Sequence, residues 1–478
     1  QDKCLEGKTK DGRKFFAYGG DFNEPFVEEL RPPFMTNNGV VLPDLTWKPV
    51  AYDLKQAYCP LIIERPDRYF ARRNSIPEEK FSLYRLNCLE GDEKAENLDC
   101  VAVIREDGNI IAKDPVKLPL LAVGGRADFD YVLPLEKKPG KEYTVTFSLL
   151  QKNDTFYAPR GSEVGMYQFL LERAPGFVAV KKTHLSKLDV AESSESFTIT
   201  LAAERKSGET INVAISKKSG LITELKKNGG MYINSGFKPT LKRPLTGIDC
   251  RPDWGWYKDY EKVRNMESSV VSFRLLKGVL SACIDFVFVM GDKNSVPVNG
   301  KLAYVFGEDG IISGNYQIYI DKALEAVPRV GLELELPGEF DELSYYGYGP
   351  MENYPDRMLS AVLGIYNSTV SSEHFPFVPP SENGGHEGTR WLTFKSKNGR
   401  AISLKSQGGF HFDAHHNTPD DYIIAAHDHE LIRREGIWVH IDAIHGPIGS
   451  EMGWSNMLSK ESALGGGSYH LAFDLDIE

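Results

Sequence analysis

The chain has 478 residues and a net charge of −11, from 56 lysines and arginines against 67 aspartates and glutamates. This acidic balance argues against nucleic acid or an anionic membrane as a partner, because both normally require a basic surface. The 41% of hydrophobic residues excludes wholesale disorder, and the length predicts two to four domains. The 44 glycines and 27 prolines, spread among short apolar runs, favour strands joined by turns.

The first segment, residues 1–58, contains many turn-forming residues and one helical pattern. The helix is predicted to begin at Pro49, with Val50, Leu54 and Ala57 on one face. Such a segment buries little surface alone, so we interpret it as the loop-and-helix end of a domain whose main part is absent from this sequence.

The next segment, residues 59–173, has the period of two that is typical of half-buried strands. Tyr143, Val145, Phe147 and Leu149 alternate with polar residues. Strand-length runs at short intervals predict a β-sandwich of roughly a hundred residues.

The remainder, residues 180–478, is predicted to be one large sandwich with no helices between its strands. Hairpin signals occur at 217–220 and 307–310, and the final residues 469–477 alternate to the end of the chain. The most apolar stretch, 278–290, contains Asp285 and is too short to span a bilayer. We therefore expect a soluble protein, either cytoplasmic or periplasmic.

Two groups of residues could serve chemistry. In a strand, His411, Asp413 and His415 would share one face, as metal ligands must. We favour instead strand and loop histidines that lie on a surface or in a hydrogen-bond network, because no cysteine joins them and zinc motifs are usually tighter. The same holds for nearby histidines. Four carboxylates in turns could form a retaining glycosidase pair, but each also suits a turn. The further histidines are His416, His427 and His429, and the carboxylates are Asp21, Glu352, Asp356 and Glu382.

Trp454 lies in the polar, glycine-flanked loop 449–455. An exposed indole can stack on the apolar face of a sugar ring while neighbouring polar groups bind hydroxyls. The alternative is a tryptophan that folds back onto the edge of the sandwich.

Four motifs in order resemble the C-terminal portion of glycoside hydrolase family 2 β-galactosidases. The resemblance implies a mainly β fold: a remnant of a (β/α)8 barrel, an immunoglobulin-like sandwich and a large galactose-mutarotase-like supersandwich. The motifs are 17–22 with Phe34 and 38–41; 348–357; 380–384 with 388–390; and 441–442 with 449–455.

The resemblance implies retaining hydrolysis of terminal β-D-galactosides, with both catalytic glutamates upstream of this sequence and no catalytic residue within it. Trp454 would stack on the sugar, and the Phe34 ring would lie beside the galactosyl site. The Phe34 carbonyl and the side chain of Asn38, or of Asn37 as a substitute, would bind sodium, while most magnesium ligands are absent. The expected partners are a β-galactoside, a catalytic barrel portion or large subunit, and further copies in an oligomer.

One segment departs from the family, since Arg243 to Asp249 replaces its usual R-A-P-x-D-N-D stretch. Trp254 and Trp256 follow, and they could contact sugar or belong to the core. Two other functions remain open. One is a non-catalytic carbohydrate-binding module; the other is mutarotase-like chemistry that uses His386 and Glu387, or the histidines of 411–416.

Overall fold

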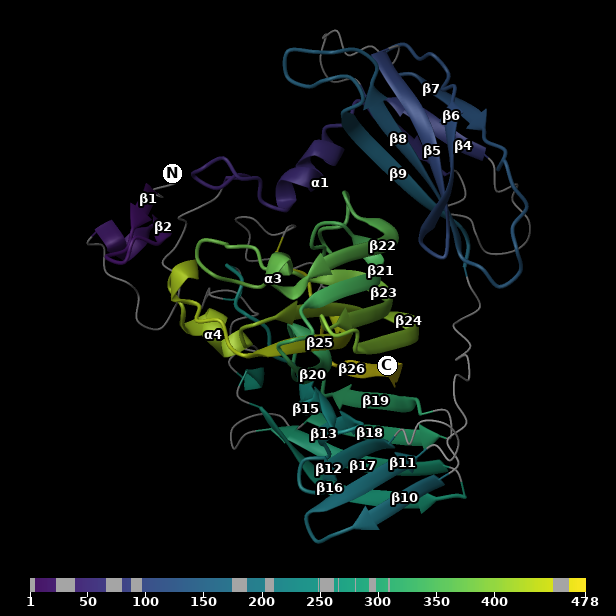
Figure 1. Ribbon diagram of the computed structural model, residues 1–478. Coiled ribbons are helices and arrows are strands. Elements are labelled where there is room, and N and C mark those ends of the chain that lie inside the picture. Colours follow the sequence, from purple (N-terminus) through teal and green to yellow (C-terminus); the bar gives the residue numbers. More distant parts are fainter. Residues whose placement is uncertain are drawn as a thin grey trace.

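The computed structural model is mainly β, as expected (Figure 1). None of the helices among its described residues combines the length and apolar character needed to cross a membrane. The structure describes residues 5–22, 39–65, 80–86, 97–173, 187–202, 210–247, 249, 262–264, 266–279, 281–291, 298–307, 310–449 and 464–478.

The N-terminal part is a hairpin followed by two helical segments. Its elements are β1 (Leu5–Lys8), β2 (Lys14–Ala17), the 3-10 helix η1 (Gly19–Phe22) and α1 (Val50–Ala57). The predicted helix is therefore present.

The buried face of α1 differs from the predicted one. Asp53 and Gln56 are buried, whereas Leu54 is 37% exposed. The Asp53 carboxylate accepts a hydrogen bond from the N–H of Ser360 at 2.8 Å, and Gln56 Oε1 accepts one from the N–H of Met166 at 2.8 Å. Polar contacts to both sandwiches attach this helix, and an apolar periodicity cannot reveal them.

The small sandwich packs two sheets around its own core, which extends from Cys59 to Leu171. The predicted strand with alternating residues is β8. One sheet contains β3 (Leu61–Glu64), β4 (Lys80–Arg85) and β7 (Arg126–Asp130); the other contains β5 (Leu98–Glu106), β6 (Asn109–Val116), β8 (Tyr143–Gln151) and β9 (Glu163–Glu172).

The described residues of the large domain form seventeen strands in one continuous set of pairings. These strands enclose the second hydrophobic core of the chain, which extends from Leu188 to Ile477. They are β10 (Lys187–Glu192), β11 (Ser196–Ala202), β12 (Thr210–Ser216), β13 (Ile222–Lys227), β14 (Gly230–Ile233), β15 (Ser235–Thr240), β16 (Glu267–Lys277), β17 (Ser281–Gly291), β18 (Val298–Gly307), β19 (Ile312–Ile320), β20 (Arg329–Pro337), β21 (Glu342–Gly349), β22 (Val362–Thr369), β23 (His386–Lys395), β24 (Ala401–His415), β25 (Gly436–His445) and β26 (Gly467–Ile477).

The expectation that no helix interrupts these strands is wrong. Two short helices, α3 (Val370–Glu373) and α4 (Pro419–Ile424), and the 3-10 helix η4 (Asp428–Glu430) lie between them. Both α-helices begin at a threonine whose side chain caps the first turn. They are too short for an apolar periodicity to identify them.

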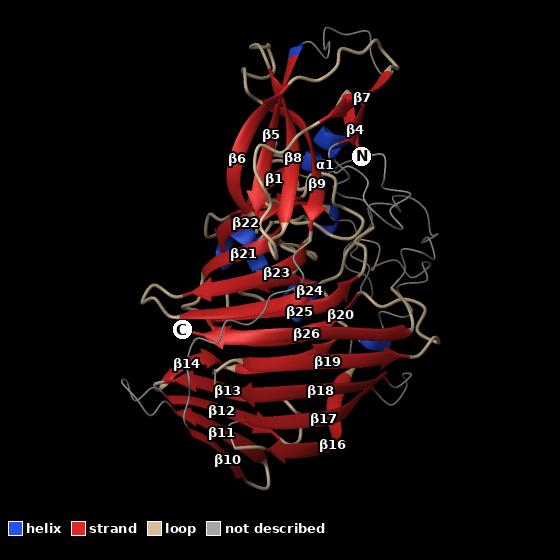
Figure 2. Ribbon diagram, turned by 90° about the vertical axis from the view of Figure 1, so that its right-hand side faces the viewer, coloured by secondary structure: helices blue, strands red, loops and turns tan. Residues whose placement is uncertain are grey.

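Strand β24 joins the two layers of the large domain (Figure 2). Its residues 402–405 pair with β26, in the layer that continues through β19, β18 and β17 to β16. Its residues 411–415 pair instead with β25, which leads through β20 and β15 to the other layer. Gly409 lies between the two halves with φ of +76°, a conformation that favours glycine. The layers diverge here, and β24, β25 and β20 form the floor of the site described below.

The small sandwich lies beyond β22 (Figures 1 and 2). The side-chain amide of Gln168 donates to the carbonyl of Leu363 at 2.9 Å and accepts from its N–H at 2.7 Å. The Glu142 carboxylate pairs with Arg390 at 3.1 Å. The Gln168 amide thus satisfies the backbone of Leu363 on the outer edge of β22, and the two contacts fix one sandwich against the other.

Candidate functional site

The residues that we expected to contact sugar or sodium lie outside the described part of the chain. The structure instead gives the positions from which their segments leave and to which they return. The outlying residues are Phe34, Asn37 and Asn38 in 23–38, Trp254 and Trp256 in 250–261, and Trp454 in 450–463.

The floor of the site is a polar face of β20, β25 and β24. In the strand register His411 lies opposite Asp442, Asp413 lies opposite His440, and His440 lies opposite Glu333. Alternate residues of the same strands point into the apolar core between the layers. The two histidines and two aspartates are each 2% exposed or less. This polar face is therefore inside the protein.

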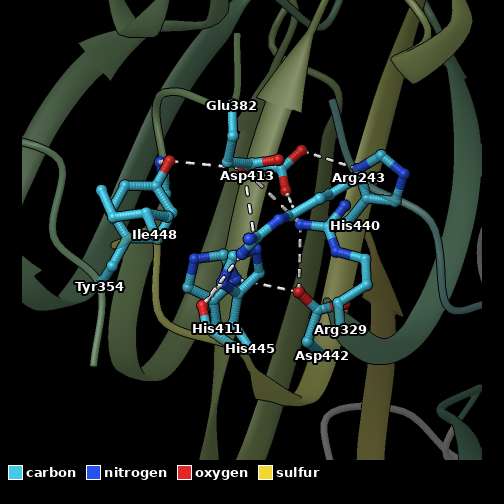
Figure 3. Close-up of polar contacts among 12 residues, drawn as sticks. Arg243, Arg329, Tyr354, Glu382, His411, Asp413, His440, Asp442, His445 and Ile448 are labelled. Atoms are coloured by element: carbon cyan, nitrogen blue, oxygen red, sulfur yellow. Dashed lines mark hydrogen bonds and ion pairs between the residues drawn. The ribbon is translucent and has the colours of Figure 1, made fainter. Parts of the chain in front are cut away.

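Arg329 lies at the centre of these side chains (Figure 3). Its guanidinium is fully buried and donates to the Asp413 carboxylate. Its Nη2 also lies 3.2 Å from Asp442 Oδ2 and 3.9 Å from Glu382 Oε1. His440 Nδ1 lies 2.7 Å from the other oxygen of Asp413. A buried cation so placed compensates carboxylates that could not otherwise stay ionised away from water.

The pKa values follow from this arrangement. Burial opposes ionisation of Asp413, but Arg329 and His440 hold its pKa well below the usual range. Burial would lower the pKa of His440, yet Asp413 raises it to about 9. Burial raises the pKa of Glu382 to about 7, although Arg329 opposes the change. At neutral pH two cations, Arg329 and His440, therefore flank Asp413.

A metal centre fits these residues poorly. Ligand atoms of His411, Asp442 and His445 lie within 4.8 Å of one another. However, Arg329 Nη2 is 3.2 Å from Asp442 Oδ2, so a divalent ion would lie beside a fixed positive charge. His411 Nδ1 is hydrogen-bonded to the same carboxylate at 2.9 Å. The guanidinium already provides the cation that a metal would supply.

Of the two arrangements expected for these histidines, surface exposure or a hydrogen-bond network, the described residues have the network. His411, Asp413 and His415 share one face of β24, as expected, and all are buried. His415 Nε2 bonds to the carbonyl of Asn383 at 2.9 Å, and burial lowers its pKa to about 4. His416 Nε2 lies 3.0 Å from an Asp341 carboxylate oxygen.

The N-terminal part contacts the large domain through another histidine. His427 Nε2 lies 2.8 Å from Asp21 Oδ2, and the Phe15 ring meets the His427 ring edge-on with centroids 5.2 Å apart. The Tyr18 hydroxyl donates to the carbonyl of Ala426. A cavity of about 190 Å³ lies beside this contact, and both flanks of the 23–38 segment line it. Its lining is Glu6, Lys14, Phe15, Phe16, Asp44, Pro376, Phe377, Val378, His427 and Asp428.

The other candidate carboxylates order nearby backbone. Glu352 pairs with Arg357 and accepts a hydrogen bond from the N–H of Gly384 at 2.6 Å. Asp356 accepts from the N–H groups of 448 and 449 at 3.0 and 2.8 Å. These contacts are the structural ones that turn carboxylates normally make.

The histidine of the mutarotase alternative is also engaged within the protein. His386 is fully buried, and its Nε2 lies 2.8 Å from Glu373 Oε2. Its Nδ1 lies 3.1 Å from the hydroxyl of Tyr345. Burial raises the pKa of Glu387, the other residue of that alternative.

Sequence reasoning missed Arg329 and His445. The strict alternation of β20, from Arg329 to Leu336, is typical of a strand with one solvent-facing side. Segments distant in sequence cover that side: the Tyr354 ring lies 5.2 Å from the His445 ring, and a Cβ at Gly385 would meet His411 Nε2 at 2.4 Å. Tyr354 lies in one of the motifs that carried the resemblance and Gly385 directly follows another, so these motifs were the available signal.

Two family descriptions match the sequence. The one described as the β-galactosidase small chain matches residues 207–475, and the one described as β-galactosidase domain 4 matches residues 93–172. The first alone covers more than half of the chain and corresponds to the large domain with the polar face.

Individual proteins agree with these matches. A β-galactosidase of Psychromonas ingrahamii is 24% identical over 97% of this chain and 44% of its own length, and one of Streptococcus thermophilus is 25% identical over 99% and 43%. The chain thus spans less than half of these curated relatives. A solved galactose 1-epimerase of Lactobacillus acidophilus matches 61% of this chain at 10% identity with a TM-score of 0.30. The chain belongs to the β-galactosidase small-chain family and corresponds to the C-terminal part of a β-galactosidase.

Proposed function

We propose that this chain completes the substrate pocket of a β-galactosidase whose two catalytic glutamates lie in polypeptide outside this sequence. The observation that carries the proposal is the match of β-galactosidases along 97% of the chain, which spans only 44% of their length. The intact enzyme would hydrolyse terminal β-D-galactosides with retention. One glutamate would attack the anomeric carbon, and the other would protonate the leaving oxygen and then activate water.

The contribution of this chain would be binding and positioning. Trp454 would stack on the sugar ring, with the Phe34 ring beside the galactosyl group. The Phe34 carbonyl and the Asn38 side chain would give sodium two of the oxygen ligands that a hard cation prefers. Most magnesium ligands, like the glutamates, would come from the catalytic barrel portion. The described carboxylates support this division, because Glu352 and Asp356 hold backbone and ion pairs.

Trp454→Ala tests the proposal in the enzyme assembled from this chain and its barrel portion. Losing an aromatic contact of about 1.4 kcal/mol raises KM about tenfold, with a smaller change in kcat, because stacking binds substrate and transition state alike. Phe156→Ala is the control, since this ring is fully exposed on the small sandwich, and it leaves both constants unchanged. Unchanged KM and inhibitor affinity in Trp454→Ala would refute the sugar-binding role.

Galactose titration of the isolated chain separates this function from a stand-alone carbohydrate-binding module. We expect no saturable binding, because the pocket is incomplete without the barrel portion. Saturable binding by the chain alone, measured by calorimetry, would support the module instead.

A further inference from the structure

Arg243 connects two segments that lie far apart in the sequence. Its side chain is fully buried, and its Nε and Nη2 bond to the two Asp249 carboxylate oxygens at 3.1 and 3.0 Å. Its Nη1 donates to the carbonyls of Gly446 at 3.2 Å and Pro447 at 3.0 Å. The planar guanidinium thus orders its own segment and the backbone that follows β25.

Asp356 binds the next two peptide groups of that backbone. It accepts hydrogen bonds from the N–H of Ile448 at 3.0 Å and of Gly449 at 2.8 Å. Gly449 has φ of +103°, a conformation that glycine adopts at little cost. Along residues 446–449, the Arg243 guanidinium therefore donates to two carbonyls and the Asp356 carboxylate accepts from two N–H groups. We call Arg243 and Asp356 the loop clamp.

The clamp acts at the root of the segment that contains Trp454. β25 ends at His445, beside the polar face, and residues 446–449 lead directly into 450–463. The N–H of Gly446 donates to the carbonyl of Pro328 at 2.8 Å, immediately before Arg329. The root is therefore fixed to the sheet on one side and clamped on the other.

We infer that Arg243 and Asp356 are positioning residues for sugar binding, an inference that rests on the proposed function above. In the described structure both residues bind the backbone of 446–449, and Arg243 also pairs with Asp249. They act by fixing residues 446–449, from which the chain continues into the segment that contains Trp454. Apolar residues of similar volume could fill the same space and preserve stability. They could not orient four peptide groups, which requires charge-assisted hydrogen bonds.

Hydrogen exchange of the full chain tests the clamp itself. Asp356→Asn keeps the size of the side chain but turns an NH2 group toward one of the two N–H donors. Arg243→Lys keeps the charge but loses the fork that reaches two carbonyls and Asp249. We expect amide exchange of Ile448 and Gly449 to accelerate about tenfold in Asp356→Asn, with the unfolding midpoint of the chain retained.

A matched control is Arg274→Lys. Arg274 also donates through Nε and Nη2 to a carboxylate, in this case both to Oδ2 of Asp285 across β16 and β17, but it is exposed. This variant leaves exchange at 446–449 unchanged. Wild-type exchange rates in both clamp variants would overturn the clamp, whatever the enzyme does.

Kinetics of the assembled enzyme test the link to sugar. Each clamp variant raises KM about fivefold to tenfold with kcat within about twofold. In a Trp454→Ala background the same substitutions add no further increase, because their effect passes through that side chain. A full additional increase in that background, or faster exchange with unchanged KM, would overturn the positioning role. An inactive assembled wild type would instead overturn the proposed function on which this inference rests.

Discussion

The two faces of β20, β25 and β24 are both buried, but by different chemistry. On one face Leu332, Ile441 and Phe412 pack into the apolar core between the layers. On the other, Asp442 and Asp413 are compensated by a buried guanidinium and an imidazole. The apolar face requires only volume and shape, whereas the polar face requires a balance of charge in a fixed geometry. The difference shows that a fixed side-chain geometry is required on the polar face. This face lies beside the described residues that lead to the predicted sugar-binding segments.

Of the substitutions on these two faces, Arg329→Met should have the largest effect on stability. It preserves most of the side-chain volume but leaves Asp413 and Asp442 buried without their cation, which lowers the free energy of unfolding by about 3–5 kcal/mol. Urea unfolding of the chain measures the loss.

Leu332→Met is the matched change on the apolar face, and it costs less than about 1.5 kcal/mol. If both substitutions destabilise the chain equally, the polar face does not depend on charge balance and the contrast is wrong.

The polar face should also make the stability of the chain depend on pH. The folded pKa of His440 is raised from 6.5 to about 9, so its stabilising contribution is complete below pH 6.5 and is lost as the pH rises through 9. The loss is about 3 kcal/mol. Glu382, whose pKa is raised to about 7, adds in the same direction.

His440→Gln removes the titration that falls between pH 6.5 and pH 9, whereas most of the Glu382 titration lies below pH 7. Unfolding free energies at pH 6.5 and pH 9 should therefore differ much less in this variant than in the wild type. An equally steep decline in both proteins would contradict the assignment of the proton to His440.

The sequence allowed much of the fold to be predicted, because strands such as β8 and β26 show their period of two locally. The sequence pattern predicted the position of α1 but not which of its faces is buried. Asp53 on that face is bound by backbone some three hundred residues away, and a local pattern cannot reveal such a contact. Burial of the polar face was hidden for the same reason. The alternation of β20 is that of a solvent-facing strand, and the cover comes from other parts of the chain. The site roles of Trp454, Phe34 and Asn38 remain predictions, which rest on the resemblance and lie outside the described residues.

The central question is whether this chain holds a reacting pair of carboxylates. The measurement is hydrolysis of a nitrophenyl β-galactoside by the purified chain alone, by its barrel portion alone and by the two together. We predict turnover only when both are present, because neither would hold the complete pocket. Measurable turnover by the isolated chain would contradict the account.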